Sequence, residues 1–164
     1  MPSSYEHFET IARALARLPR QEPATQPAAE TPSLHPFDSR NIHPDLPPKV
    51  RELFDDGHFP EATSLAFRFL DKKVQHHSGL TESGYKLMMA AFNGASAQVK
   101  LKLFVTTSER DEQEGYRFVF AGSMQGIRNP RAHEVTLVDD PDICLDHLSL
   151  VSLLLRRLEQ AGYK

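Results

Sequence analysis

Four residues whose side chains can act on a phosphodiester lie close together in the segment GIRNPRAHE (126–134): Arg128, Asn129, Arg131 and His133. An imidazole titrates at about pH 6.5 when unperturbed, so it can take a proton from a ribose 2′-hydroxyl or give one to a leaving 5′-oxygen. A guanidinium keeps its charge, can hold the scissile phosphate and stabilises the negative charge of the transition state. An asparagine amide can orient either group or the sugar. This chemistry requires no metal ion.

The same residues also suit an ordinary helix end. Arginine and histidine satisfy unpaired carbonyls at a helix C-terminus and face the negative end of the helix dipole. Pro130 disfavours helical dihedral angles at Asn129, so we expect the helix to end or kink there. A kinked last turn can bring Arg128 and His133, five positions apart, to the same side. An Arg and a His at this spacing often occur by chance, so both interpretations stay open.

The apolar pattern predicts the elements that position this segment. Large apolar residues recur at helical spacing in five stretches. The first runs over 46–56 and ends at Gly57, and the second begins at Pro60 and ends near 76–79. The third covers 81–94, the fourth runs from about 109 to the motif, and the fifth starts at Asp140–Pro141 and ends at Gly162. We therefore predict an all-α bundle of about five helices.

One link between these helices has a different pattern. In AQVKLKLFVTT (97–107), Val99, Leu101, Leu103 and Val105 alternate with other residues as in a β-strand. A single short strand without a partner makes a poor sheet. We expect a short irregular or β-like link near 99–106, either an ordered connection or a small edge hairpin.

The first 41 residues form a separate region in this interpretation. Apolar residues recur at helical spacing within residues 1–20, which gives an amphipathic helix that could dock a partner or pack on its own domain or a dimer mate. Residues 19–36 are rich in proline, alanine and glutamine and are typical of a linker. We predict that the folded domain spans 42–164.

Composition limits the class of protein. The chain has 164 residues and a net charge of −3, so any contact with nucleic acid would have to come from a local basic patch. The single cysteine, Cys144, excludes an internal disulfide and a cysteine zinc cluster, and its apolar neighbours predict a buried structural thiol. No stretch is long and apolar enough for a membrane helix or a signal peptide, so we expect a cytoplasmic protein without membrane contact.

Other polar clusters are weaker candidates. His76–His77 lie near Glu82, but adjacent helical residues point about 100° apart and no third metal ligand follows, so we expect a solvated helix end. Asp55–Phe59 is interpreted as a turn in which Gly57 supplies the positive φ. Several basic residues are expected on solvated faces, where those near the motif could contact phosphates: Lys72–Lys73, Arg110, Arg117 and Arg156–Arg157.

The segment from Arg128 to His133 matches the R-x4-H signature of the HEPN superfamily (higher eukaryotes and prokaryotes nucleotide-binding domains), with Asn129 as the polar residue that often follows the arginine. The likeness continues through LFDDGHFPEATSLAFRFLDKKVQHHSGL, GYKLMMAAF, GYRFVFAGSMQGIRNPRAHE and LSLVSLLLRRLEQA. Together these stretches resemble the small prokaryotic Ymh-type family. The resemblance covers about residues 42–161.

The resemblance implies a helical bundle that dimerises and places two R-x4-H motifs in one cleft. Nuclease members of the superfamily are metal-independent endoribonucleases that leave a 2′,3′-cyclic phosphate, and many act as toxins or in defence against phage. Carried over by position, Arg128 and His133 are the catalytic pair, Asn129 is the accessory residue, and Arg131 and Glu134 are supporting residues.

The expected partners are therefore an RNA substrate and a second copy of the chain, with no cofactor and no metal. An antitoxin or a larger defence protein could bind through residues 1–20. Some members of the superfamily are not catalytic and bind nucleotides or proteins instead. A non-catalytic nucleotide-binding or interaction module is thus the alternative.

Overall fold

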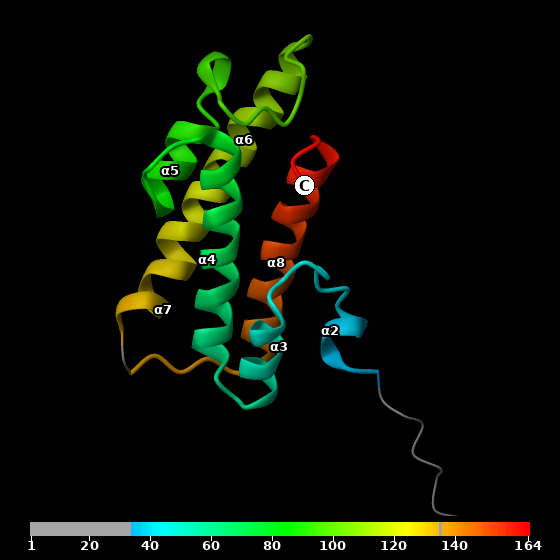
Figure 1. Cartoon of the computed structure of the whole chain (residues 1–164), viewed down its shortest axis with the longest axis vertical. Helices are drawn as coiled ribbons and strands as arrows, with labels where there is room; N and C mark the ends of the chain where they lie inside the picture. The colour runs from blue at the N-terminus through cyan, green and yellow to red at the C-terminus, as the bar shows by residue number, and fades with distance from the viewer. Residues whose placement is uncertain (1–33, 135) are drawn as a thin grey trace, which may run out of the picture. The chain divides into compact units, whose positions relative to one another are not determined.

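The computed structural model describes residues 34–134 and 136–164 (Figure 1). The predicted amphipathic segment at 1–20 and nearly all of the predicted linker lie outside the described residues. Leu34–Lys164 form one compact unit, within which the predicted domain start at residue 42 falls. None of the helices in the described part is long and apolar enough to cross a bilayer.

The described unit is built from helices, and the prediction of an all-α bundle is confirmed. No strand occurs in residues 34–134 or 136–164. The five predicted stretches correspond to α3, α4, α5, the run from α6 to α7, and α8. In chain order the elements are α2 (Pro36–Ser39), α3 (Pro48–Asp55), α4 (Phe59–Ser78), α5 (Gly84–Ala91), η1 (Gly94–Ser96), α6 (Thr107–Ser123), η2 (Met124–Arg128), α7 (Asn129–His133) and α8 (Pro141–Gln160).

Local sequence signals account for most helix ends. Asp140 caps α8 by accepting a hydrogen bond from the Ile143 N–H at 2.8 Å, and Pro141 fills the first turn, as predicted. Gly79 ends α4 with a φ of 71°, which a residue with a Cβ rarely adopts. Thr106 and Glu109 form a reciprocal capping box at the start of α6.

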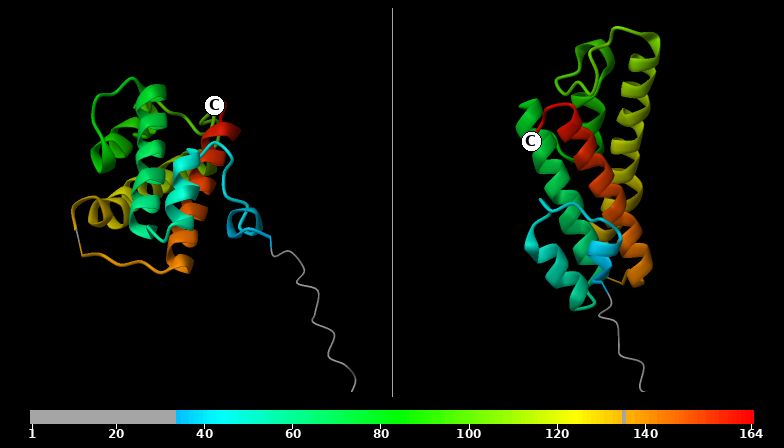
Figure 2. Two further views of the ribbon diagram at one scale, coloured as in Figure 1. Left: turned by 60° about the horizontal axis from the view of Figure 1, so that its bottom comes forward. Right: turned by 90° about the vertical axis from the view of Figure 1, so that its right-hand side faces the viewer.

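The long helix α4 is the centre of the bundle. It packs against α8, α3, α5 and α7, while α5 also packs on α6 (Figures 1 and 2). The interior is apolar and tightly filled, and the rings of Phe92 and Phe120 stack with centroids 4.4 Å apart. Its largest fully buried apolar side chains include Phe67, Leu70, Leu87, Met88, Phe92, Phe120, Met124, Leu148, Leu154 and Leu158.

The short helix α2 was not among the predicted elements. It carries Phe37 into the core, where the ring lies 5.3 Å from that of Phe54. Arg40, just after α2, forms an ion pair with Asp146 on α8 at 2.7 Å. These contacts tie the segment that precedes α3 to the bundle.

The link at 97–106 is irregular, so the β-like alternative is wrong. The buried side chain of Gln113 holds this segment. Its Oε1 accepts a hydrogen bond from the Leu101 N–H at 2.8 Å, and its Nε2 donates to the carbonyls of Val99 and Phe92 at 2.9 and 3.3 Å. One amide thus satisfies backbone groups that a neighbouring strand would otherwise pair. Val99 and Leu101 are buried, whereas Leu103 and Val105 are exposed.

Candidate active site at the end of the α6–α7 helix

The motif lies on one continuous helical run made of α6, η2 and α7. Asn129 has helical dihedral angles (φ −61°, ψ −48°) and the helix continues to His133, so the predicted helix end at this residue is wrong. The element η2 is a single π-helical turn, in which the Asn129 N–H donates to the Met124 carbonyl five residues earlier. Pro130 lacks an N–H, and in a regular α-helix its ring would press on the carbonyl four residues before it. The wider turn accommodates the proline without breaking the helix.

Continuity of the helix changes the geometry of the motif. Residues five positions apart point about 140° apart around an α-helix, so Arg128 and His133 leave α7 in different directions. The predicted convergence at a kink is therefore not realised within one copy. π-Turns of this kind often occur at functional sites.

Arg131 is the residue that stabilises the helix end. Its Nε and Nη2 both donate to the Asp139 carboxylate at 2.6 Å, and its Nη1 donates to the Ile127 carbonyl at 3.0 Å. The side chains of this pair are only 10% and 5% exposed. Arg131 thus performs the capping and packing task that an arginine at a helix end is expected to perform.

Arg128 is held differently. Its Nη1 donates to the Asn129 side-chain oxygen at 3.2 Å, and the Asn129 Nδ2 donates in turn to Gln125 Oε1 at 3.3 Å. Its Nε is buried without a hydrogen-bond partner, and no carboxylate lies within ion-pair distance in the described ranges. The guanidinium therefore keeps its charge uncompensated, and Asn129 orients it.

His133 and Glu134 close the motif. His133 is the last residue of α7 and is exposed, and its ring makes no hydrogen bond to any residue that the structure describes. Glu134 is also exposed, and its N–H caps α7 by donating to the Pro130 carbonyl at 2.8 Å. The predicted catalytic and supporting roles of these residues stay predictions.

The sequence matches, over residues 40–158, the protein family described as "Protein of unknown function (Hypoth_ymh)". The chain belongs to the Ymh family. The part that matches this family contains the whole α6–α7 run with its motif. A search of curated proteins and a search of solved structures each gave no match.

Sequence reasoning missed a second imidazole beside the motif of this Ymh-family chain. His147 on α8 lies near Arg131 and Asp139, and burial, followed by the charge of Arg131, lowers its pKa below the usual value. Its Nδ1 is buried without a hydrogen-bond partner among the described residues. The packing of both α8 and α7 on α4 gives His147 this position, and no local pattern in the sequence marks it.

Arg68 on α4 is a second residue that the sequence did not reveal. It lines a pocket of about 340 Å³ between α3, α4 and α7. The other residues around this motif-side pocket are Leu53, Glu61, Ser64, Leu65, Arg131 and Ala132. The pocket places the Arg68 side chain beside the helix that carries the motif.

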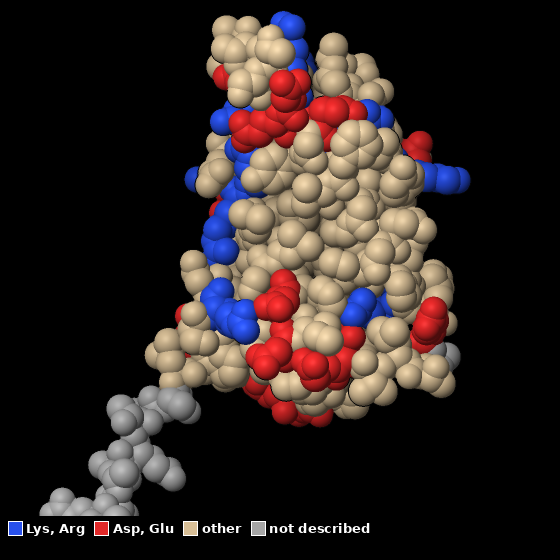
Figure 3. All heavy atoms as spheres, turned by 180° about the vertical axis from the view of Figure 1, so that it is seen from behind, with Lys and Arg blue, Asp and Glu red and all other residues tan. Residues whose placement is uncertain are grey.

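An exposed apolar face covers the side of the unit behind α4. Gly115, Val119 and Gly122 form one exposed stripe along α6, with Phe118 beside it. The neighbouring part of α8 exposes Ile143 and Leu153. Figure 3 shows that uncharged residues cover a continuous area of this side between two groups of acidic residues. Phe118 is 56% exposed, which is unusual for so large an apolar side chain.

Two histidine clusters outside the motif are explained by their own contacts. The nitrogen and oxygen atoms of His43, Asp45 and Glu159 lie within 4.8 Å of one another. The Asp45 N–H donates to His43 Nδ1 at 3.2 Å, and His43 Nε2 lies 3.1 Å from the Glu159 carboxylate. Both ring nitrogens thus already have a protein partner. His76 and His77 lie at the end of α4 as predicted, but only His76 is exposed to solvent. The His77 ring packs against Tyr163 with centroids 5.2 Å apart, and its Nε2 is buried without a hydrogen-bond partner among the described residues.

Iodoacetamide is expected to leave Cys144 unmodified in the folded protein near pH 8 and to modify it in denaturing urea. Burial raises the pKa of this thiol to about 11, and the Sγ contacts the Thr63 hydroxyl and the Phe59 carbonyl. Roughly one thiol in a thousand is ionised at that pH, and only the thiolate reacts. Mass spectrometry over time measures the modification. Equal rates with and without urea would contradict the predicted structural role of this thiol.

Proposed function

We propose that this chain is a metal-independent endoribonuclease of the HEPN type that acts in the cytoplasm as a toxin or an anti-phage defence component. One observation carries the proposal. Of the two arginines in the motif, Arg131 is committed to Asp139 and the helix end, whereas Arg128 and the exposed His133 have no such partner among residues 34–134 and 136–164. A purely structural helix end would not need the second arginine and the histidine.

The proposed reaction is transesterification within the RNA. The neutral imidazole of His133 accepts the proton of the ribose 2′-hydroxyl, and the 2′-oxygen forms a bond to phosphorus. The bond from phosphorus to the 5′-oxygen breaks, and this oxygen takes a proton from the imidazolium of a second copy. The products are a 2′,3′-cyclic phosphate and a 5′-hydroxyl. Arg128 holds the phosphate and stabilises the charge of the transition state, and Asn129 orients Arg128.

The cleavage products test this reaction directly. The full chain is incubated with tRNA, rRNA and single-stranded RNA in excess EDTA, alongside the Arg128→Ala and His133→Ala variants. We expect cleavage by the unchanged chain, with cyclic phosphate at the new 3′ ends. Cleavage that EDTA abolishes, or that neither substitution affects, would contradict the proposal.

The divergence of Arg128 and His133 supports a composite site made by two copies. The exposed apolar face of α6 and α8 offers the surface for such a homodimer, and it leads along α6 into the motif. Exposed glycines on α6 let two helices approach closely, since no atom lies within 4 Å of the Cβ position at Gly115 or Gly122.

The substitution Phe118→Asp is expected to convert the dimer to a monomer and to reduce RNA cleavage with it. A charge buried within an apolar interface opposes association unless it finds a partner there. Sedimentation equilibrium measures the change. Leu103→Asp is the matched control because Leu103 is 87% exposed but lies in the link before α6. A Phe118→Asp protein that stays dimeric would rule out this interface.

The alternative is a non-catalytic nucleotide-binding or protein-interaction module. The separation of Arg128 and His133 around α7 favours this alternative if no second copy completes the site. In that case the protein would bind nucleotides or RNA without cleaving the RNA. The EDTA assay distinguishes the two functions.

A further inference from the structure

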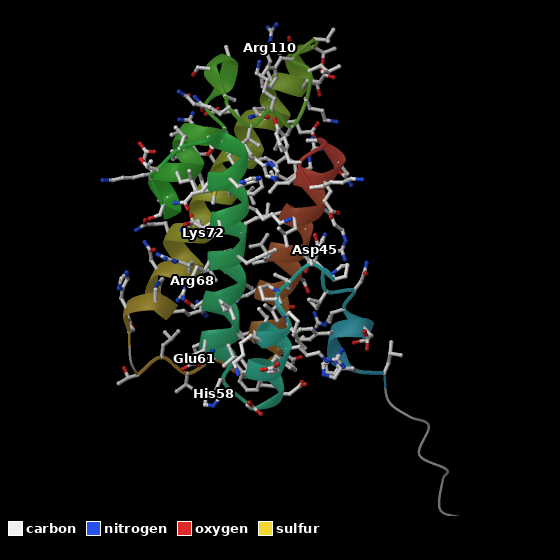
Figure 4. The ribbon with its side chains drawn as sticks, in the orientation of Figure 1. Asp45, His58, Glu61, Arg68, Lys72 and Arg110 are labelled. Atoms are coloured by element: carbon white, nitrogen blue, oxygen red, sulfur yellow. The ribbon has the colours of Figure 1, made fainter. Side chains whose placement is uncertain are left out.

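A line of side chains runs along the exposed surface of α4 and leads away from the motif. Glu61, Leu65, Arg68, Lys72 and His76 follow one another at intervals of three or four residues, which places them on one helical stripe. Figure 4 shows Glu61, Arg68 and Lys72 in succession along the helix. We call Arg68, Lys72 and His76 the α4 stripe.

The two cations nearest the motif are not neutralised. Arg68 and Lys72 are exposed, and neither lies within 4.0 Å of a carboxylate in the part of the chain that the structure describes. The only side-chain partner of Lys72 in this part is the neutral amide of Gln75, at 2.9 Å. In a chain with a net charge of −3, these residues form a local positive surface.

Each end of the α4 stripe opens into a surface hollow. At the motif end, Arg68 shares the motif-side pocket with Ala132 of α7. At the other end is a pocket of about 390 Å³ lined by Phe69, Lys72, Lys73, His76 and Lys164. The Phe69 ring lies there, with Lys73 Nζ 5.6 Å from its centroid. Cations beside an aromatic ring are the combination that binds single-stranded nucleic acid.

We propose that the α4 stripe binds the backbone of a single-stranded RNA and leads it to the motif. Arg68 and Lys72 bind successive phosphates, since one turn of the helix separates them by about 6 Å along its axis. Phe69 follows Arg68 directly on α4, so its ring stacks with the base between these two phosphates. Glu61 repels phosphate beyond Arg68, so the strand leaves α4 there and crosses to α7. Cleavage of the strand once it reaches the motif is the part of this proposal that rests on the proposed ribonuclease function.

RNA binding tests the α4 stripe without requiring cleavage. The full chain with His133→Ala is titrated against a labelled unstructured oligoribonucleotide in EDTA, with and without Arg68→Gln and Lys72→Gln together. Loss of two phosphate contacts is expected to reduce the affinity for the single strand by about 20-fold near 0.1 M salt. The slope of log K against log salt concentration should become shallower by about 1.4. The matched control, Lys86→Gln with Lys100→Gln, removes two exposed cations that lie outside both hollows and also lack a carboxylate within 4.0 Å among the described residues. It should bind within twofold of the parent, about the effect of a general charge change.

The possible results separate the two proposals. Weaker binding by the Arg68/Lys72 variant alone supports the α4 stripe, even if the unchanged chain cleaves no RNA. Equal binding by both double variants overturns the stripe, even if cleavage at the motif is demonstrated. An equal loss in both would also overturn it, because binding would then depend only on total charge.

Discussion

Replacing His133 with alanine is expected to reduce the rate of RNA cleavage by about 10²–10⁴-fold, the range for loss of a general acid or base. The side chain is exposed and makes no hydrogen bond in the described structure, so its removal should leave the free energy of unfolding nearly unchanged. Cleavage rates under single-turnover conditions and urea unfolding measure the two quantities on the same preparations.

Arg128→Lys and His58→Ala provide the controls for this result. Lysine keeps the charge at position 128 but loses the planar fork, so we expect cleavage to fall although RNA still binds. His58 is an exposed histidine just before α4, and its removal should not affect the rate. A His133→Ala protein that cleaves as fast as the His58→Ala protein would eliminate His133 from the reaction.

Replacing Arg131 with methionine is expected to lower the free energy of unfolding by about 3–5 kcal/mol, the cost of leaving one member of a buried ion pair alone. The Asp139 carboxylate would remain 5% exposed and lose both of its 2.6 Å hydrogen bonds. The Ile127 carbonyl would lose its donor as well. Urea unfolding followed by circular dichroism measures the loss.

A double substitution distinguishes the loss of stability caused by an unpaired buried charge from the net contribution of the intact ion pair to the free energy of unfolding. Arg131→Met combined with Asp139→Leu removes both charges, and we expect it to recover most of the lost stability, because a buried pair and an apolar pair are often nearly equivalent. Arg128→Ala is the matched arginine substitution, since Arg128 forms no ion pair in the described residues, and it should cost far less. If Arg128→Ala destabilises the fold as much as Arg131→Met, the structural division between the two arginines is wrong.

The helical fold was largely predictable because its signals are local. Proline and aspartate at the start of α8 and glycine at the end of α4 act through the backbone of their own turn. Pro130 shows the limit of the same reasoning. The rule that proline ends a helix assumes regular α-helical hydrogen bonding. In the π turn of η2 the hydrogen bond spans five residues, so the rule does not apply there. The packing of η2 on α4 and α5 is a tertiary effect that the local pattern does not contain.

The candidate site was predictable only in part for a related reason. The spacing of Arg128 and His133 marked the motif, and Arg131 was assigned only a supporting role, but the sequence did not show what Arg131 contacts. Asp139, which distinguishes them, lies in the next connection and reaches Arg131 only after α8 has packed. Arg68 and His147 likewise come to the motif from α4 and α8. Their positions depend on the assembled bundle, and neither carries a local signal.

The hydrogen-bond pairing of the π turn also determines the direction in which the residues after it point around the helix axis. Its Asn129–Met124 hydrogen bond absorbs one residue more than a regular turn would hold. A change to α-helical pairing would rotate everything after it by about 100°, the angle of one residue. The core side chains of α6 would keep their places, whereas Arg128 and His133 would face new directions. The orientation of the motif is therefore encoded by the register of one backbone turn. Deleting one residue there would let the turn become α-helical and leave the motif facing as it does, whereas the same change of pairing without a deletion would turn it.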